Sequence, residues 1–268
     1  MISFFKRVRQ NLLIDNKVGR YMKYAIGEIF LVVFGILIAL QIESTYQDHL
    51  QSKKESSYLI NLRLDLEDQI ETINDQIDFE SRFQNAGKRL LSLYDSRNSF
   101  EASSSFYKDF ETLANRKTFT RIDATYTDLT SSGMIDLIKN VDLKQKVVDL
   151  YQNLERFEVI INKNNSIYVD DQFIPLAQKL GNFSGLFISD EAAIRAYEHG
   201  MDTTTFKASK NLIAISNESI NRKENELLLY NSITFRYLLA MAHHSYALDL
   251  KNQTQATLDL IKKELNKD

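Results

Sequence analysis

Four histidines are the side chains best suited to metal binding or proton transfer in this sequence: His49, His199, His243 and His244. The last two are adjacent, and adjacent residues on a helix point about 100° apart. Two histidines that share a metal ion on one helix are instead four residues apart. The pattern therefore predicts half-exposed structural roles for this pair, and neither a metal ion nor another cofactor is expected.

Motifs for nucleophilic catalysis and phosphate binding are missing from the sequence. Serines are frequent, but none lies in a G-x-S-x-G motif. There is no P-loop, no G-x-G-x-x-G and no H-E-x-x-H. The chain has no cysteine, which excludes a thiolate nucleophile, a disulfide and a cysteine-based zinc or iron-sulfur site. We therefore expect a protein that is not an enzyme.

Two groups of neighbouring carboxylates have the residue type of a catalytic pair or of a calcium-binding loop. Asp170 and Asp171 are neighbours, so their side chains diverge on a helix, and the following residues 173–176 indicate that they mark a helix end. The acidic run DLEDQIETINDQID, Asp65 to Asp78, lacks the central glycine and the acid spacing of a calcium-binding loop. It is more typical of the solvated face of a helix.

Glu28 is the carboxylate in the most unusual surroundings. It lies near the start of an apolar run, YAIGEIFLVVFGILIALQI, from Tyr24 to Ile42. Helical side chains tilt toward the N-terminus, so the Glu28 carboxylate can reach back toward the basic residues Arg20 and Lys23. We expect an orienting charge at the membrane interface. A carboxylate that handles ions or contacts a partner is the alternative.

The apolar run has the length of a membrane-spanning helix. At about 1.5 Å per residue it covers about 28 Å, close to the ~30 Å hydrocarbon layer of a bilayer. Residues 29–40 contain no polar side chain and so offer no face to water. A cleavable signal peptide would have a shorter charged leader and a cleavage site that ALQIES does not provide. The sequence predicts an uncleaved transmembrane helix over residues 24–42.

The charge distribution predicts the orientation of this helix. Residues 1–23 carry six basic residues and one acid, whereas residues 43–268 have a net charge of −7, since the whole chain is −3, the leader +5 and Glu28 −1. By the positive-inside rule, residues 1–23 are a cytoplasmic leader, expected as a basic amphipathic helix on the lipid surface or, alternatively, as a disordered tail. Residues 43–268 then form an extracytoplasmic, periplasmic domain. An acidic domain is also a poor surface for nucleic acid.

Small residues within the span indicate a possible contact between two helices. Gly27, Leu31, Gly35 and Ala39 fall on one helical stripe, and Gly35 with Ala39 allows two helices to approach closely. A homodimer is therefore included among the expected assemblies, besides the contact with the lipid bilayer.

The composition favours an all-α fold, since only one proline and eight glycines interrupt 268 residues. Apolar residues recur every three or four positions from Leu59 to Ile77, which predicts one long amphipathic helix that leaves the membrane. A last long helix is expected near residues 224–267. The face of this helix that we expect to be buried carries Leu227, Tyr230, Tyr237, Met241 and Leu248. Antiparallel pairing of the two long helices gives an elongated, coiled-coil-like helical bundle.

Shorter helices and a loop are predicted between the two long helices. Helical periodicity predicts helices over residues 103–115, 124–131 and from 143 into the 160s. Gly, Ser, Asn and Thr are enriched from residue 180 to 205, which predicts a loop around one short helix that ends at Gly200.

The stretch TYTDLTSSGMIDLIKN, Thr125 to Asn140, has a structural and a functional interpretation. In the structural one, Gly133 ends a helix in the left-handed conformation, and Met134 or Ile135 packs back over it. In the functional one, a binding surface at this turn is lined by Arg121, Tyr126 and Asp128.

The same stretch, with the basic leader and the apolar run, resembles an uncharacterised family of single-span membrane proteins from Gram-negative bacteria of the Bacteroidetes group. Members of that family begin with a short basic leader and a YAIGEI-like start of the span. The resemblance rests directly on about one fifth of the chain. It implies a single span in the inner membrane and a helical extracytoplasmic part, and no activity attaches to it.

Three kinds of function fit these expectations. Our prediction is a non-enzymatic interaction or scaffold protein whose periplasmic domain binds another membrane or envelope protein. A sensory or ligand-binding module of a signalling system is an alternative, although the leader is too short for an output domain. An accessory subunit of an ion-driven membrane complex is a third. The identity of proteins cross-linked to the span would discriminate among them.

Overall fold

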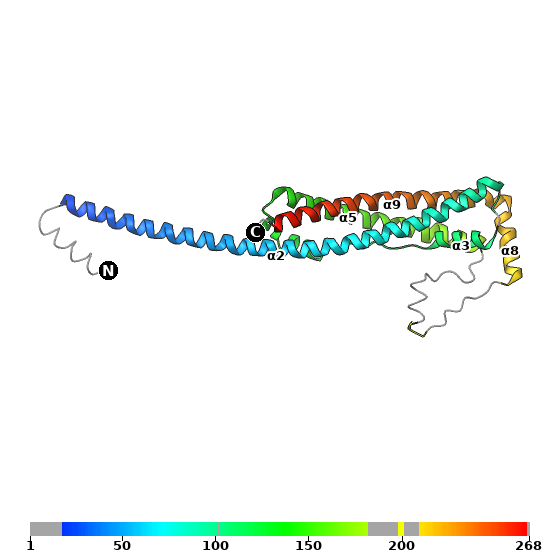
Figure 1. Cartoon of the computed structure of the whole chain (residues 1–268), viewed down its shortest axis with the longest axis horizontal. Helices are drawn as coiled ribbons and strands as arrows, with labels where there is room; N and C mark the ends of the chain where they lie inside the picture. Colours follow the sequence, from blue (N-terminus) through cyan, green and yellow to red (C-terminus); the bar gives the residue numbers. More distant parts are fainter. Residues whose placement is uncertain (1–17, 101, 182–197, 201–208, 267–268) are drawn as a thin grey trace. The chain divides into compact units, whose positions relative to one another are not determined.

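The computed structural model describes residues 18–100, 102–181, 198–200 and 209–266 (Figure 1). The chain divides into two units, residues 1–57 and 58–268, which are described separately. One long helix, α2, Val18–Arg97, contributes to both. All regular secondary structure in the described ranges is helical, which confirms the predicted all-α class. Most of the predicted leader and of the predicted loop after residue 180 lies outside these ranges.

In the first unit, the predicted transmembrane segment is helical throughout and none of its side chains is buried. The large apolar side chains from Tyr24 to Ile42 are 47–68% exposed. The most apolar window of α2 has a mean hydropathy of 2.4. Apolar surface of this extent is unfavourable in water. By length and composition, α2 is able to cross a membrane once.

The second unit is a helical bundle whose longest elements are the C-terminal part of α2 and α9, Lys223–Leu265. The chain between them forms α3, Ser104–Ala114; α4, Ala124–Ser131; a 3₁₀ helix, η1, Met134–Leu137; α5, Val141–Asn164; a π-helix, η2, Asn165–Phe173; α6, Ile174–Leu180; and α8, Lys210–Asn221. The helices predicted near residues 103–115, 124–131 and 143 onward are confirmed.

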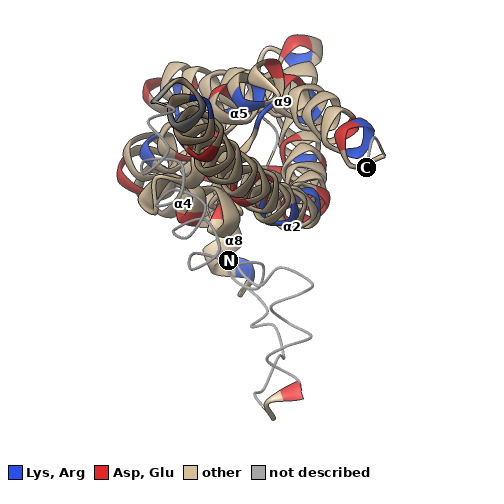
Figure 2. Ribbon diagram, turned by 90° about the vertical axis from the view of Figure 1, so that its left-hand side faces the viewer, with Lys and Arg blue, Asp and Glu red and all other residues tan. Residues whose placement is uncertain are grey.

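The two long helices run antiparallel within this unit. Tyr94, near the end of α2, donates a hydrogen bond of 2.7 Å to Glu226, near the start of α9. At the other end of α9, Lys262 forms an ion pair of 2.9 Å with Glu67. The predicted antiparallel pairing is therefore confirmed. Figure 2 looks along the helices and marks the acidic and basic residues on their ribbons.

The core of the second unit consists of two apolar clusters. The first gathers α2 from Leu59 to Ile73 with α4, η1, α5 and the end of α9. The second gathers α2 from Phe83 to Leu90 with α3, α6 and the first half of α9. Three buried polar residues, Gln76 and Glu80 on α2 and His243 on α9, lie between the clusters along these helices.

The predicted buried face of α9 is wrong in part, because Leu227, Met241 and Leu248 are 69, 43 and 41% exposed. The face that is buried instead includes Leu229, Ile233, Arg236, Ala240, His243, Ala247 and Leu250. This face contains an arginine and a histidine, while leucines occur on several sides of the helix. Hydrophobic periodicity therefore indicated the wrong side.

Short local signals set the ends of the helices around residue 133. Asn140 Oδ1 accepts a hydrogen bond of 3.1 Å from the Leu143 amide and begins α5. Gly133 has a φ of 69°, in the left-handed region that disfavours other residues. Met134 and Ile135 pack against the first cluster. The structural interpretation of the SSG sequence is thereby confirmed.

The helix end predicted at Asp170 and Asp171 is wrong, because α5 continues through the π-helix η2 into α6. Pro175 does not interrupt this path; it lies in the first turn of α6, directly after the π-helix, and the chain stays helical past it. Asp170 instead forms an ion pair of 2.7 Å with Arg116.

Candidate binding site

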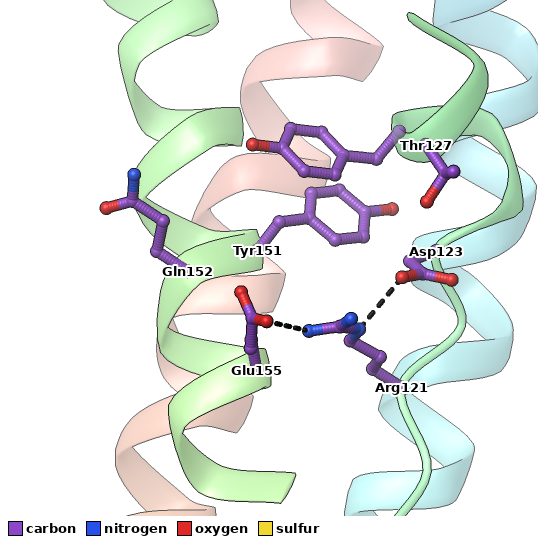
Figure 3. A pocket seen from close by; sticks show the side chains of 7 residues that line it. Arg121, Asp123, Thr127, Tyr151, Gln152 and Glu155 are labelled. Carbon is purple, nitrogen blue, oxygen red and sulfur yellow. Dashed lines mark hydrogen bonds and ion pairs between the residues drawn. The ribbon is translucent and has the colours of Figure 1, made fainter. Parts of the chain in front are cut away.

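A small pocket lies where the extended segment between α3 and α4 meets α5 (Figure 3). It includes two of the three residues predicted for a binding surface, Arg121 and Tyr126. The full lining is Arg121, Asp123, Tyr126, Thr127, Tyr151, Gln152 and Glu155. Asp128 is not part of it, because its Oδ2 accepts a hydrogen bond of 2.8 Å from the Tyr58 hydroxyl and so connects α4 to α2.

Two polar side chains of α2 hold the extended segment in place. Asp65 Oδ2 accepts a hydrogen bond of 3.0 Å from the Thr125 amide in the first turn of α4. Gln69 Oε1 accepts one of 2.7 Å from the Ile122 amide. Asp123, which precedes α4, makes no side-chain capping bond, so Asp65 supplies an acceptor that this helix start requires. Part of the acidic run predicted as a solvated face therefore positions the pocket.

Arg121 is surrounded by three carboxylates. Its Nε lies 2.8 Å from Asp123 Oδ2 and 3.6 Å from Glu158 Oε2. Its Nη1 lies 3.3 Å from Glu155 Oε1, and Figure 3 shows the guanidinium between Asp123 and Glu155. Burial pulls the pKa of Arg121 down, but hydrogen bonds with Glu155 and Asp123 outweigh burial and leave this pKa above its usual value. The guanidinium is therefore satisfied by the protein, and three carboxylates around one cation leave an excess of two negative charges.

Two stacked tyrosines form the apolar wall of the pocket. The rings of Tyr126 and Tyr151 lie 4.2 Å apart with an angle of 6° between their planes. Tyr151 is 2% exposed, and its hydroxyl has no hydrogen-bond partner among the described residues. Figure 3 shows this hydroxyl turned toward the side of the pocket that carries Asp123 and Thr127.

The Tyr151 hydroxyl keeps its proton at any physiological pH. Burial raises the pKa of Tyr151, and the nearby carboxylates of Asp65 and Asp123 raise it further. A buried hydroxyl without a partner costs about 1–3 kcal/mol relative to one that is hydrogen-bonded. Buried polar groups are rarely left in this state, so the Tyr151 hydroxyl is the polar group of the pocket that most requires a hydrogen-bond partner.

The size of the pocket limits what it holds. The cavity measures about 100 Å³, whereas sites for drug-sized ligands and cofactors measure about 300–1,000 Å³. It therefore accommodates a small group, such as the end of one side chain. Within the described ranges, no three His, Cys, Asp or Glu side chains are placed to hold a metal ion. The excess negative charge and the aromatic wall suit an organic cation.

The pocket lies in a part of the chain that is shared with other proteins. Residues 28–185 match a family of unknown function, DUF6090. This range is more than half of the chain and contains every residue that lines the pocket. The chain belongs to this family. No curated protein and no solved structure matches the chain significantly. The resemblance to an uncharacterised family is thereby confirmed, while its bacterial group and membrane topology stay predictions.

The other residues singled out from the sequence lie apart from the pocket. Glu28 and the stripe of Gly27, Leu31, Gly35 and Ala39 are in the exposed helix of the first unit. A Cβ at Gly27 or Gly35 would meet no atom within 4 Å, so both positions have room for a second helix. Contact through this stripe stays a prediction.

The expectation that both adjacent histidines are half-exposed is wrong for one of them. His243 is 3% exposed, whereas His244 is partly exposed. The reason is the position of the buried face of α9, which passes through residue 243.

Five residues of the pocket were not anticipated from the sequence. They are Asp123, Thr127, Tyr151, Gln152 and Glu155. Tyr151 and Glu155 are four residues apart on α5 and so share a helical face, which is the one signal that relates them. Their proximity to Arg121 depends on how the extended segment crosses α5, which no local pattern specifies.

Proposed function

We propose that this member of the DUF6090 family is a single-pass inner-membrane protein whose helical domain binds a partner protein in the periplasm, without catalysis. The observation that carries the membrane assignment is the exposure of residues 24–42. An apolar helix in the core of a soluble protein is covered by other elements, whereas here every large apolar side chain is about half exposed or more. A bilayer is the solvent that suits such a surface.

The orientation follows from the charges that flank the span. Six basic residues precede it within residues 1–23, and the domain that follows is acidic. Residues 1–23 are therefore placed in the cytoplasm and residues 43–268 in the periplasm.

The absence of cysteine from the chain allows a clean test of this topology. Ser3→Cys places one thiol in the leader, and Lys146→Cys places one on the exposed surface of α5. In spheroplasts, a membrane-impermeant maleimide is expected to label Lys146→Cys directly and Ser3→Cys only after permeabilisation. The reverse pattern would contradict the orientation. Release of the unmodified chain from membranes by alkaline carbonate would contradict the anchor.

The pocket suggests how the partner is recognised. We infer that it receives the ammonium or guanidinium group of a basic side chain of the partner. Asp123, Glu155 and Glu158 supply two negative charges beyond those that neutralise Arg121, and the stacked tyrosines supply a wall for the methylenes. The Tyr151 hydroxyl would accept a hydrogen bond from the cation.

A small probe tests this recognition. N-acetyl-lysine methylamide, added to the full chain in detergent micelles, is expected to shift the NMR signals of Tyr126 and Tyr151. The shifts should saturate at a concentration of about 10 mM. The norleucine analogue, which lacks the charge, is expected not to do so. Glu155→Gln should weaken binding about tenfold or more, because it removes a charge that contacts the cation. Asp149→Asn is the matched control, since it neutralises an exposed acid on the same helix. Equal binding of both probes, or equal effects of both variants, would contradict the assignment.

A further inference from the structure

One face of α9 is largely exposed, contains several large apolar residues and is free of charged side chains. From Leu227 to Leu248 the only acidic or basic side chain, histidines aside, is Arg236, which is 3% exposed and points into the bundle. On the outer side, the exposed residues include Leu227, Leu238, Met241 and Leu248, at 69, 54, 43 and 41%. This segment of 22 residues is about 33 Å long.

The spacing on this face is that of a coiled-coil seam. Leu227, Leu238, Met241 and Leu248 fit a repeat with alternating steps of four and three residues. The remaining positions of the repeat are Asn231 and Ser245, which are exposed, and Thr234, which is partly buried; all three are polar and uncharged. A step pattern of this kind places one continuous stripe toward a partner helix. Glu226 and Asp249 flank this uncharged segment at its two ends.

We propose that this seam pairs with the same seam of a second copy of the chain, as a parallel two-stranded contact along α9. In such a pair every residue of the seam meets its own copy, so a charged residue there would meet a like charge. The seam contains none between Glu226 and Asp249. Pairing between identical faces requires this absence of charge, whereas pairing with a different helix is commonly selected by opposite charges across the contact.

Asn231 supports the same assignment. It is exposed, and it occupies the position of the repeat equivalent to that of Leu238, seven residues later. A single asparagine at such a position in a coiled coil selects two strands in parallel register, because the two amides hydrogen-bond to each other across the axis. Asn231 would therefore fix the alignment of the two copies.

The parallel direction also agrees with the proposed membrane anchor, on which this one step rests. Glu67 on α2 pairs with Lys262 near the end of α9, so residue 58 lies toward the C-terminal end of α9. In a parallel pair, both copies of residue 58 lie at the same end. In an antiparallel pair, the two copies of residue 58 would instead lie at opposite ends of the paired helices. The proposed contact along α9 does not involve the residues of the pocket near Arg121.

Cysteine cross-linking of the full chain in micelles tests the proposal, because the background contains no thiol. Leu227→Cys, Leu238→Cys and Leu248→Cys are each expected to give a disulfide-linked dimer under mild oxidation. Val159→Cys is the control, since it is 58% exposed on α5 and away from the seam. Cross-linking at Leu238→Cys alone would indicate an antiparallel contact and overturn the parallel one. Cross-linking no greater than that of the control would overturn the pairing altogether.

Mass measurement of the assembly separates this seam from the small-residue stripe of the span. Leu238→Glu places two like charges in the seam at an exposed position and is expected to raise the dissociation constant of the dimer by about 100-fold. Gly35→Leu and its control Val33→Leu alter the span and are expected to leave the α9 disulfide unchanged. A Leu248→Cys disulfide that forms equally well in the presence of Leu238→Glu would overturn the proposal.

Discussion

His243 Nδ1 lies 3.3 Å from Glu80 Oε1 between the two apolar clusters of the bundle, and the two side chains are 4 and 5% exposed. A carboxylate accepts hydrogen bonds, so His243 Nδ1 donates to Glu80, while Nε2 lies 3.0 Å from the side-chain amide nitrogen of Asn164. Gln76 donates a further bond of 2.8 Å to the same Glu80 oxygen. This polar layer connects α2, α5 and α9 and favours one register among them.

Glu80 also balances the buried charge of Arg236. Arg236 is 3% exposed, and it donates to the carbonyl oxygens of Leu113 and Asn115 at 3.0 and 3.2 Å. Burial lowers the pKa of Arg236 to about 10, and the charge of Glu80 acts in the opposite direction. Arg236 is therefore charged at neutral pH and depends on Glu80 for a counter-charge.

We expect Glu80→Gln to destabilise the bundle by about 3 kcal/mol, because it leaves the Arg236 charge buried without compensation. Chemical unfolding of the full chain in detergent, followed by circular dichroism, measures this loss. Glu71→Gln is the control, since Glu71 is exposed on the same helix. Equal midpoints for the two variants would mean that the layer does not stabilise the fold.

The sequence indicated most helices of this fold but not the polar layer. The helix around residues 103–115 and the end at Gly133 follow from local signals, namely apolar periodicity and a left-handed glycine. The prediction of the buried face of α9 was wrong because Arg236 and His243 lie on that face. A pattern of apolar residues cannot predict that polar residues are buried. Their partners, Glu80 and the carbonyl of Leu113, are more than 100 residues away in the sequence.

The candidate site was foreseen in part for the same reason. Arg121, Tyr126 and Asp128 were predicted as a binding surface because they shortly precede a distinctive turn, and the first two line the pocket. Glu155 and Tyr151 looked like ordinary residues of an amphipathic helix, and only the path of the segment held by Asp65 and Gln69 brings them beside Arg121.

A buried carboxylate on α3 should make the stability of the bundle depend on pH. Glu111 is 6% exposed, and its Oε2 has no hydrogen-bond partner among the described residues. Burial raises the pKa of Glu111 from 4.5 to about 7. The folded state thus binds the proton more tightly than the unfolded state. Its contribution to stability is complete below about pH 4.5 and is lost as the pH rises through about 7.

Glu111→Gln is therefore expected to have no effect near pH 4.5 and to stabilise the chain at pH 8. The gain should be about 3 kcal/mol, since each tenfold change in proton affinity corresponds to about 1.4 kcal/mol. Unfolding of both proteins across this pH range measures the difference. Asp171→Asn, at an exposed position, is expected to leave the pH dependence unchanged. A variant curve parallel to that of the wild type would contradict this account.

Gly87 permits a close contact between α2 and α9. A Cβ at this position would lie 2.9 Å from Tyr237 Cβ, closer than packed carbon atoms approach. Alanine favours a helix over glycine by about 1 kcal/mol, but overpacking costs about 1–3 kcal/mol. We expect Gly87→Ala to be destabilising and Asn85→Ala, at an exposed position of the same helix, to be neutral or stabilising. A more stable Gly87→Ala would show that the helices separate without cost.

Glu28 is the one acid within the predicted span, and its role depends on where its carboxylate lies. It follows Tyr24 by about 6 Å along α2, and helical side chains tilt toward the N-terminus. That direction leads to Lys23 and, in the proposed topology, to the cytoplasmic headgroups. A carboxylate that reaches this interface needs no partner within the bilayer.

Neutralising the charge distinguishes an interfacial role from a functional one. If Glu28 only orients the helix at the interface, Glu28→Gln should insert with the same topology and reach the same abundance, because glutamine at an interface costs little. Photo-cross-linking from the span in whole membranes should then give the same partners for both proteins. Lys23→Gln, which removes a basic residue instead, is the comparison for effects on orientation. Loss of a cross-linked partner from an inserted and abundant Glu28→Gln protein would show that the carboxylate itself makes the contact.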